Sequence, residues 1–266
     1  DAQFNLGIAH QKNQDLANAI ACFQNVIELA PNNGAAHFKL ANAFRANSEF
    51  QKAILHYKKT LTLESNHAPA HCNLGLSLQA IGEIAQAIRQ YKAALKIDPK
   101  FVPAQGNLGN VMMAQGAFEN AIKAFLKTLK LQPENYITSL NLGRAYKENG
   151  DFQAAFNAFS KVISMQPEFS EAHNDLGLTL YGQGKLENAL KSYQEAVDLN
   201  PNYADAYNNM GVAHQELGAV TRAIESYQKA IAINPNHLVA YGQKMFQQAS
   251  LCDWSALQQD RTMIAT

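Results

Sequence analysis

Alanine recurs along this chain of 266 residues at a fixed step of 34 residues, without an insertion or deletion. The alanines of the series are Ala19, Ala53, Ala87, Ala121, Ala155, Ala189 and Ala223. A constant period of this size is typical of an array of structural repeats, in which each repeat contacts only its neighbours. Such an array offers a long surface to a partner but no obvious place for a buried catalytic site.

Other residue types keep the same step and phase. An aromatic residue follows each alanine by four positions, at Phe23, Tyr57, Tyr91, Phe125, Phe159, Tyr193 and Tyr227. Proline follows it by twelve positions in every repeat except one, which has Ser65. A small residue, usually the glycine of a Leu-Gly pair, precedes it by twelve positions. Glycine also precedes it by five positions, except in the first two repeats, which have Gln14 and Ser48.

Each unit is predicted to form two helices. Leu108 and Val111 have the spacing of one helical face, and a second apolar set with helical spacing begins at Ala121. Gly116, which lies between them, can adopt the left-handed conformation that ends a helix. Pro133 cannot donate a hydrogen bond into a continuing helix and is expected to end the second one. Since one helix pair cannot bury its apolar stripe alone, we expect the stacked pairs to share one core that includes the aromatic column.

These columns resemble the tetratricopeptide repeat family over residues 1–236, as seven consecutive repeats. The resemblance implies an all-α fold, a right-handed α-solenoid superhelix of seven helix pairs, in which the first helices line the concave surface. Residues 237–266 are expected to form a C-terminal capping helix and a junction segment. The sequence departs from the family where an early tryptophan is common, and it has Gln3, His37, His71, Gln105, Ser139, His173 and Tyr207 there.

Composition indicates which kinds of partner and location to expect. The chain has 22 Lys and Arg and 22 Asp and Glu, so its formal charge of zero argues against nucleic acid or an anionic membrane as the main partner. Its three cysteines form no C-x-x-C pair and suit a reducing compartment, so a cytoplasmic location is predicted. No long apolar run predicts a membrane span. The chain opens in mid-motif, so we expect it to be part of a longer protein.

The concave face is the expected binding site. The residue before each Leu-Gly pair belongs to one column, which contains Asn5, Lys39, Asn73, Asn107, Asn141, Asp175 and Asn209. An asparagine side chain can pair with both the N–H and the C=O of a peptide bond. The column therefore predicts a ladder that holds an extended peptide by its backbone, and Asn42, Asn110 and Arg144 lie one turn later. Hydrogen bonding between neighbouring helices is the alternative role for these asparagines.

Family members that grip a C-terminal carboxylate use a clamp of Lys, Arg and two asparagines. Asn42 and Asn73 match its asparagines, but Phe38 and Pro103 stand at two of its basic positions. This sequence is therefore not expected to form the carboxylate clamp.

The C-terminal segment is open to two interpretations. It is expected to cover the end of the repeat core as a capping helix. The run Leu251-Cys252-Asp253-Trp254, followed by Asp260-Arg261, is also similar to the junction in O-linked N-acetylglucosamine transferases, where an asparagine-lined repeat superhelix meets the catalytic domain. That resemblance implies that this segment belongs to the substrate-recruiting arm of such an enzyme.

The predicted function is therefore a non-catalytic scaffold for proteins or peptides, with no cofactor. A free-standing adaptor and an assembly protein that pairs through array ends or convex faces are the alternatives. The histidines of one column, His37, His71 and His173, have no evident third ligand, so no metal site is predicted.

Overall fold

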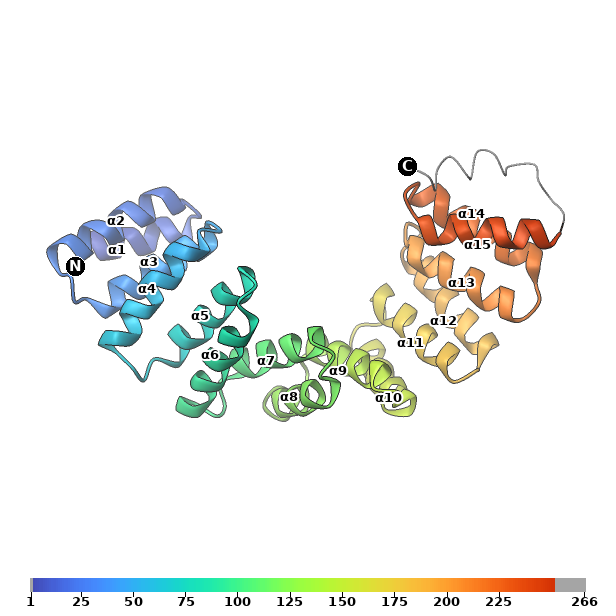
Figure 1. The fold of residues 1–266 in the computed structure, drawn as a ribbon, viewed down its shortest axis with the longest axis horizontal. Coiled ribbons are helices and arrows are strands. Elements are labelled where there is room, and N and C mark those ends of the chain that lie inside the picture. The colour runs from blue at the N-terminus through green and yellow to red at the C-terminus, as the bar shows by residue number, and fades with distance from the viewer. Residues whose placement is uncertain (1, 252–266) are drawn as a thin grey trace. The chain divides into compact units, whose positions relative to one another are not determined.

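The computed structural model of the chain describes residues 2–251, and this part forms fifteen α-helices and no strand (Figure 1). The helices are α1 (Ala2–Lys12), α2 (Leu16–Leu29), α3 (Gly34–Ala46), α4 (Phe50–Leu63), α5 (Ala68–Ala80), α6 (Ile84–Ile97), α7 (Val102–Ala114), α8 (Phe118–Leu131), α9 (Tyr136–Glu148), α10 (Phe152–Met165), α11 (Ser170–Gly182), α12 (Leu186–Leu199), α13 (Ala204–Glu216), α14 (Val220–Ile233) and α15 (Leu238–Ser250). The predicted all-α repeat fold is confirmed.

The chain divides into two compact units, Asp1–Pro133 and Glu134–Thr266. Unit 1 contains α1–α8, which are four helix pairs, and unit 2 contains α9–α14, which are three pairs, followed by α15. The predicted boundary between an array over residues 1–236 and a terminal segment over 237–266 remains a prediction. The Cys252-Asp253-Trp254 run lies outside the described residues.

The turn inside each repeat has the predicted left-handed residue. Gly116 has φ +71°, and the equivalent Gly82, Gly150, Gly184 and Gly218 have positive φ as well. The first two repeats adopt the same backbone without glycine, since Gln14 has φ 61° and Ser48 has φ 58°. A side chain in this region is unfavourable because its Cβ approaches the backbone. The repeat geometry is therefore retained even where the preferred residue is missing.

The column of aromatic rings fills the space between the two helices of each pair. A Cβ atom added to Gly75 would lie 2.6 Å from the ring of Tyr91, and one added to Gly143 would lie 2.7 Å from the ring of Phe159. The ring of the second helix therefore requires a small residue at this position of the first, which is Ala41 in the second repeat and glycine in the others. The predicted burial of the aromatic column is confirmed, since its tyrosines and phenylalanines are almost completely inaccessible to solvent.

Neighbouring repeats pack through both of their helices. In unit 1, α2, α4 and α6 each contact the first helix of the following repeat, and in unit 2, α10, α12 and α14 do the same. The first helices also contact one another: α1 with α3, α3 with α5, and α5 with α7 in unit 1, and α9 with α11 and α11 with α13 in unit 2. Each unit therefore has one continuous face built from first helices.

The last helix lies on the second helix of the seventh repeat. α15 contacts α14, and its buried residues include Ala240 and Tyr241. Its opposite side leaves Leu238, Val239 and Phe246 more than half exposed. No helix in the described part of the chain is long and apolar enough to cross a bilayer.

Candidate peptide-binding faces

The predicted site residues lie on the first helices of both units. We call these two surfaces ladder face 1, with Asn5, Lys39, Asn42, Asn73, Asn107 and Asn110 on α1, α3, α5 and α7, and ladder face 2, with Asn141, Arg144, Asp175 and Asn209 on α9, α11 and α13. Asn5 and Asn110 are exposed, Asp175 is buried, and the others are partly buried. The structure thus brings the predicted residues together in two groups, one in each unit.

In ladder face 1, Asn42 receives hydrogen bonds from two neighbouring helices. Asn73 Nδ2 donates to Asn42 Oδ1 over 2.8 Å, and the hydroxyl of Tyr57 donates to the same oxygen over 2.6 Å. These bonds join α3 to α5 and to α4. The ladder asparagines therefore bond between helices, as in the second role considered for them, and this bonding also holds the carboxamide of Asn73 in one orientation.

The next step of ladder face 1 has a sulfur acceptor. Asn107 Nδ2 lies 3.6 Å from Cys72 Sγ, which joins α7 to α5. Burial raises the pKa of the Cys72 thiol, an effect that the Asn107 bond and the charge of Arg45 oppose. The Nε atom of Arg45 is buried and has no hydrogen-bond partner within the described residues. Arg45 and Lys39 give this face two cations, and the described residues of α1, α3, α5 and α7 include no Asp or Glu.

Ladder face 2 has the Arg144–Asp175 ion pair at the positions where ladder face 1 has the hydrogen bond between Asn42 and Asn73. Arg144 Nε donates to Asp175 Oδ2 over 2.6 Å, which joins α9 to α11. Burial raises the pKa of the Asp175 carboxyl above its ordinary value, although Arg144 acts in the opposite direction. The desolvation of the carboxylate therefore outweighs the attraction of its partner. Further along the face, Asn209 Nδ2 donates to Asn174 Oδ1 over 3.0 Å and joins α13 to α11.

Several tyrosines of the buried column reach the ladder faces with their hydroxyl groups. Tyr91 donates to Gln79 Oε1 over 2.9 Å, and Tyr227 donates to Gln215 Oε1 over 3.1 Å. Burial raises the pKa of both tyrosines. The tyrosines of the aromatic column were the signal for these bonds, because a buried hydroxyl requires a partner.

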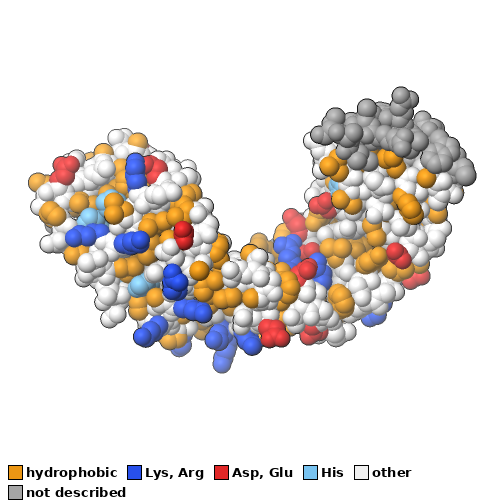
Figure 2. Space-filling model, viewed as in Figure 1, with side chains coloured by type: hydrophobic (Ala, Val, Ile, Leu, Met, Phe, Trp, Pro, Cys, Tyr) orange, Lys and Arg blue, Asp and Glu red, His pale blue; other side chains and the backbone are white. Residues whose placement is uncertain are grey.

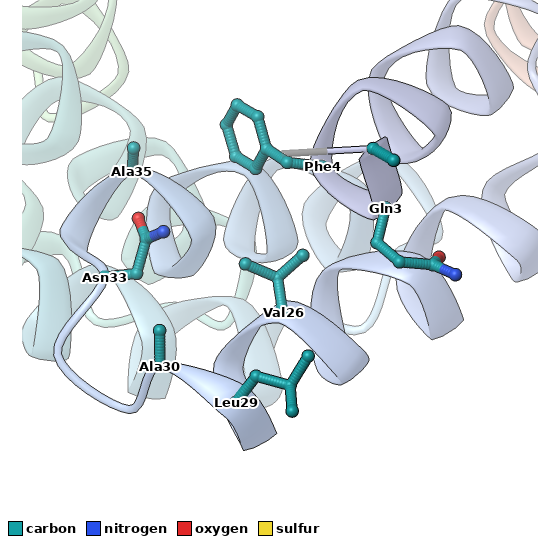
Figure 3. Close-up of a pocket in the computed structure, with 8 residues that line it drawn as sticks. Gln3, Phe4, Val26, Leu29, Ala30, Asn33 and Ala35 are labelled. Carbon is teal, nitrogen blue, oxygen red and sulfur yellow. The ribbon is translucent and has the colours of Figure 1, made fainter.

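Each unit has a hollow that sequence reasoning missed. A hollow of about 480 Å³ in unit 1 is lined by Phe4 of α1, by Val26 and Leu29 at the end of α2, and by Asn33 and Ala35 at the start of α3 (Figure 3). A hollow of about 450 Å³ in unit 2 lies beside Gln215 of α13 and is lined on α15 by Leu238, Val239, Gly242, Gln243 and Phe246. Both hollows offer apolar walls with a few polar groups.

The histidine column has a structural role in three repeats. His37 Nε2 lies 3.0 Å from the carbonyl oxygen of Pro31, and its Nδ1 lies 3.0 Å from Nδ1 of His56. His71 and His173 make the same contact with the carbonyl groups of Ser65 and Pro167. The described residues contain no group of three or more His, Cys, Asp or Glu that could hold a metal ion.

Comparison with family models covers most of the chain. A model described as "TPR repeat" matches residues 79–116, 109–150, 143–184 and 179–218. Two models described as "Tetratricopeptide repeat" match residues 204–237 and 4–68. A comparison with curated protein sequences found no match.

Solved structures with the same fold are numerous. The C-terminal part of a TPR repeat-containing protein from Cytophaga hutchinsonii has a TM-score of 0.75 at 18% identity and covers 90% of this chain and 98% of its own. YrrB, described as a TPR protein with an unusual peptide-binding site, has a TM-score of 0.59 at 25% identity and covers 71% and 97%. A structure of MamA has a TM-score of 0.57 at 27% identity and covers 61% and 95%.

Proposed function

Because this chain belongs to the tetratricopeptide repeat family, we propose that it is a non-catalytic protein-interaction scaffold that binds extended peptide segments along its ladder faces. The observation that carries the proposal is the row of oriented carboxamides on ladder face 1, above all the Asn73–Asn42 pair. YrrB, to which the chain is similar, has a peptide-binding site by its description, and this similarity supports the same class of partner.

The interhelical bonds of the asparagines prepare them for a ligand. Asparagine has two N–H donors and one acceptor oxygen. The bond from Asn73 to Asn42 uses one donor of Asn73, so its oxygen can accept a peptide N–H. Since the carboxamide is already oriented by its neighbour, little conformational entropy is lost when the peptide binds. Each bond contributes about 0.5–1.5 kcal/mol, so affinity requires several along the face.

The hollows supply the apolar part of the recognition. We propose that a peptide held by Asn73 and Asn107 continues toward α1, where Phe4 and Val26 line a hollow. An apolar side chain placed there leaves water, which stabilises the complex by about 25 cal/mol per Å² of buried surface. Lys39 and Arg45 favour acidic residues in the same peptide. We therefore expect ladder face 1 to select extended peptides that combine an apolar residue with acidic ones.

The experiment compares two double variants in binding to a peptide selected from a phage-displayed random library. Asn73→Ala/Asn107→Ala is expected to weaken binding at least about tenfold, which corresponds to about 1.4 kcal/mol. The variant also loses two interhelical bonds, at about 1 kcal/mol of stability each, which urea unfolding would measure separately. Asn25→Ala/Asn120→Ala is the matched control, because both residues are exposed on the second helices. Unchanged affinity in the Asn73/Asn107 variant would leave these asparagines with a structural role only.

A finer proposal places the chain in a glycosyltransferase. The asparagine column and the run Leu251-Cys252-Asp253-Trp254 support a substrate-recruiting arm of an O-linked N-acetylglucosamine transferase-like enzyme, in which acceptor proteins lie along the ladder faces. The parent reading frame tests it, since this role requires a glycosyltransferase domain after residue 266. A frame that encodes something else would favour the free-standing adaptor. The three dispersed cysteines support a cytoplasmic location for either protein.

A further inference from the structure

The zero net charge of the chain conceals a separation of charge between its two units. Residues 1–133 contain 13 Lys and Arg and 8 Asp and Glu, a formal charge of +5, whereas residues 134–266 contain 9 and 14, a charge of −5. Both counts follow from the sequence alone. The zero net charge of the whole chain therefore does not exclude an anionic partner for unit 1.

The excess positive charge lies on three successive second helices. α4, α6 and α8 carry nine basic residues, which we call the basic face: Lys52, Lys58, Lys59, Arg89, Lys92, Lys96, Lys123, Lys127 and Lys130. Glu119 is their single acidic residue, whereas α10, α12 and α14 of unit 2 carry four basic and four acidic residues. Figure 2 shows Lys and Arg side chains gathered over this part of unit 1.

On α6 and α8 the basic residues occupy one side of the helix. Arg89, Lys92 and Lys96 follow one another at steps of three and four, and Lys123, Lys127 and Lys130 do so at steps of four and three, so each set points to one side. All nine except Lys59 are exposed. Within residues 2–251, Lys52 is the only member with an ion-pair partner. The face thus keeps nearly all of its charge available for an external ligand.

The remaining composition of the face distinguishes between anionic ligands. Eight of the nine residues are Lys and one is Arg, whereas nucleic-acid surfaces favour Arg for bidentate contacts and aromatic rings for stacking with bases. The large apolar side chains exposed on these helices are leucines, with Leu55 65% and Leu126 47% exposed. Exposed Lys and Leu on one surface suit the interface of an anionic bilayer, where lysine attracts phosphate and leucine enters the headgroup region.

We propose that the basic face of α4, α6 and α8 docks unit 1 on the surface of an anionic lipid bilayer. The basic residues span eight positions on each helix, from Lys52 to Lys59, from Arg89 to Lys96 and from Lys123 to Lys130, or about 11 Å. A charge pattern that repeats from helix to helix matches a uniformly charged plane better than the discrete shape of one protein partner. The first helices are not part of this surface, so the proposal is independent of the ladder faces.

The test measures cosedimentation of the full chain with lipid vesicles. We expect binding to phosphatidylcholine vesicles that contain about 30% phosphatidylserine, no binding to phosphatidylcholine alone, and loss of binding at high salt. Lys58→Gln/Lys92→Gln/Lys127→Gln removes one exposed charge from each helix and should weaken binding at least about tenfold. Lys12→Gln/Lys185→Gln/Lys191→Gln removes three exposed charges elsewhere and should weaken it less than about twofold.

A second variant separates a bilayer from other polyanions. Leu55→Asn/Leu126→Asn keeps every charge and should weaken vesicle binding about threefold while leaving heparin binding unchanged. Circular dichroism would confirm that each variant is folded. The proposal is overturned if the wild-type chain ignores phosphatidylserine, if the two lysine variants lose binding equally, or if the chain binds a DNA duplex more tightly than the vesicles.

Discussion

The two units are built from the same repeat, yet they differ in how they use its variable positions. Unit 1 has an amide ladder, basic second helices and two repeats without the turn glycine. Unit 2 has an ion pair in its ladder, a balanced set of charges on its second helices and glycine in the turn inside each of its three repeats. The repeat columns that set the fold are alike in both. The residues proposed to bind a partner and the residues that set the fold therefore occupy separate positions of the 34-residue unit.

The largest effect is expected from filling the space that the aromatic ring requires. Gly75→Val in unit 1 and Gly177→Val in unit 2 would each drive a side chain into a tyrosine ring, at about 3 kcal/mol of stability or more. If the units unfold separately, each variant should destabilise only its own unit in hydrogen exchange resolved by residue. Equal losses of protection in both units would show that they unfold together. Ala80→Ser, at an exposed end of α5, is a control for unit 1.

A smaller effect is expected from pH, with opposite signs in the two units. Burial and the neighbouring His37 lower the pKa of His56 in unit 1 to about 4. As the pH falls, the imidazole of the unfolded chain is therefore protonated before that of the folded chain. The free energy of unfolding should fall by about 1–2 kcal/mol as pH drops from 6.5 to 4. Asp175 in unit 2 has a raised pKa, so as the pH rises its carboxyl group loses the proton in the unfolded chain before it does so in the folded chain. Its contribution to the free energy of unfolding should fall as pH rises from 3.8 through the raised value.

Urea unfolding between about pH 3 and pH 7 would test both signs. His56→Gln should remove the loss of stability on acidification, and Asp175→Asn should remove the opposite loss as pH rises. Unchanged pH profiles in these variants would contradict the assignment.

The smallest effect is expected at the turns that differ between the units. Gln14→Gly and Ser48→Gly should each stabilise unit 1 by about 0.5–1 kcal/mol, because glycine adopts their left-handed backbone without strain. Gly150→Ala in unit 2 is the reverse change and should destabilise by a similar amount. Thermal unfolding of the three variants provides the measurement, and a fall in midpoint for Gln14→Gly would show that its side chain has a role in the turn.

The sequence predicted the features that repeat and missed those that vary. The helix pairs, the turn at Gly116 and the buried aromatic column all follow from local propensity and period, so the phase of the array was sufficient to predict them. The Asn73–Asn42 bond, the Arg144–Asp175 pair and the Tyr91–Gln79 bond depend on how side chains of different helices meet in space. The division into two units and the hollow beside Phe4 were not predicted either, because both depend on packing rather than on period.

The tyrosine hydroxyls that reach the ladder faces give the protein an internal reporter. The hydroxyl of Tyr57 donates to Asn42 Oδ1, and Asn42 also belongs to the proposed binding surface. A peptide that draws Asn42 toward itself would leave a buried phenol without its acceptor, an arrangement that costs free energy. Occupation of the surface would then change the near-ultraviolet absorption of Tyr57 deep inside the repeat. Binding could be followed without any label, and Tyr57→Phe would make that signal silent.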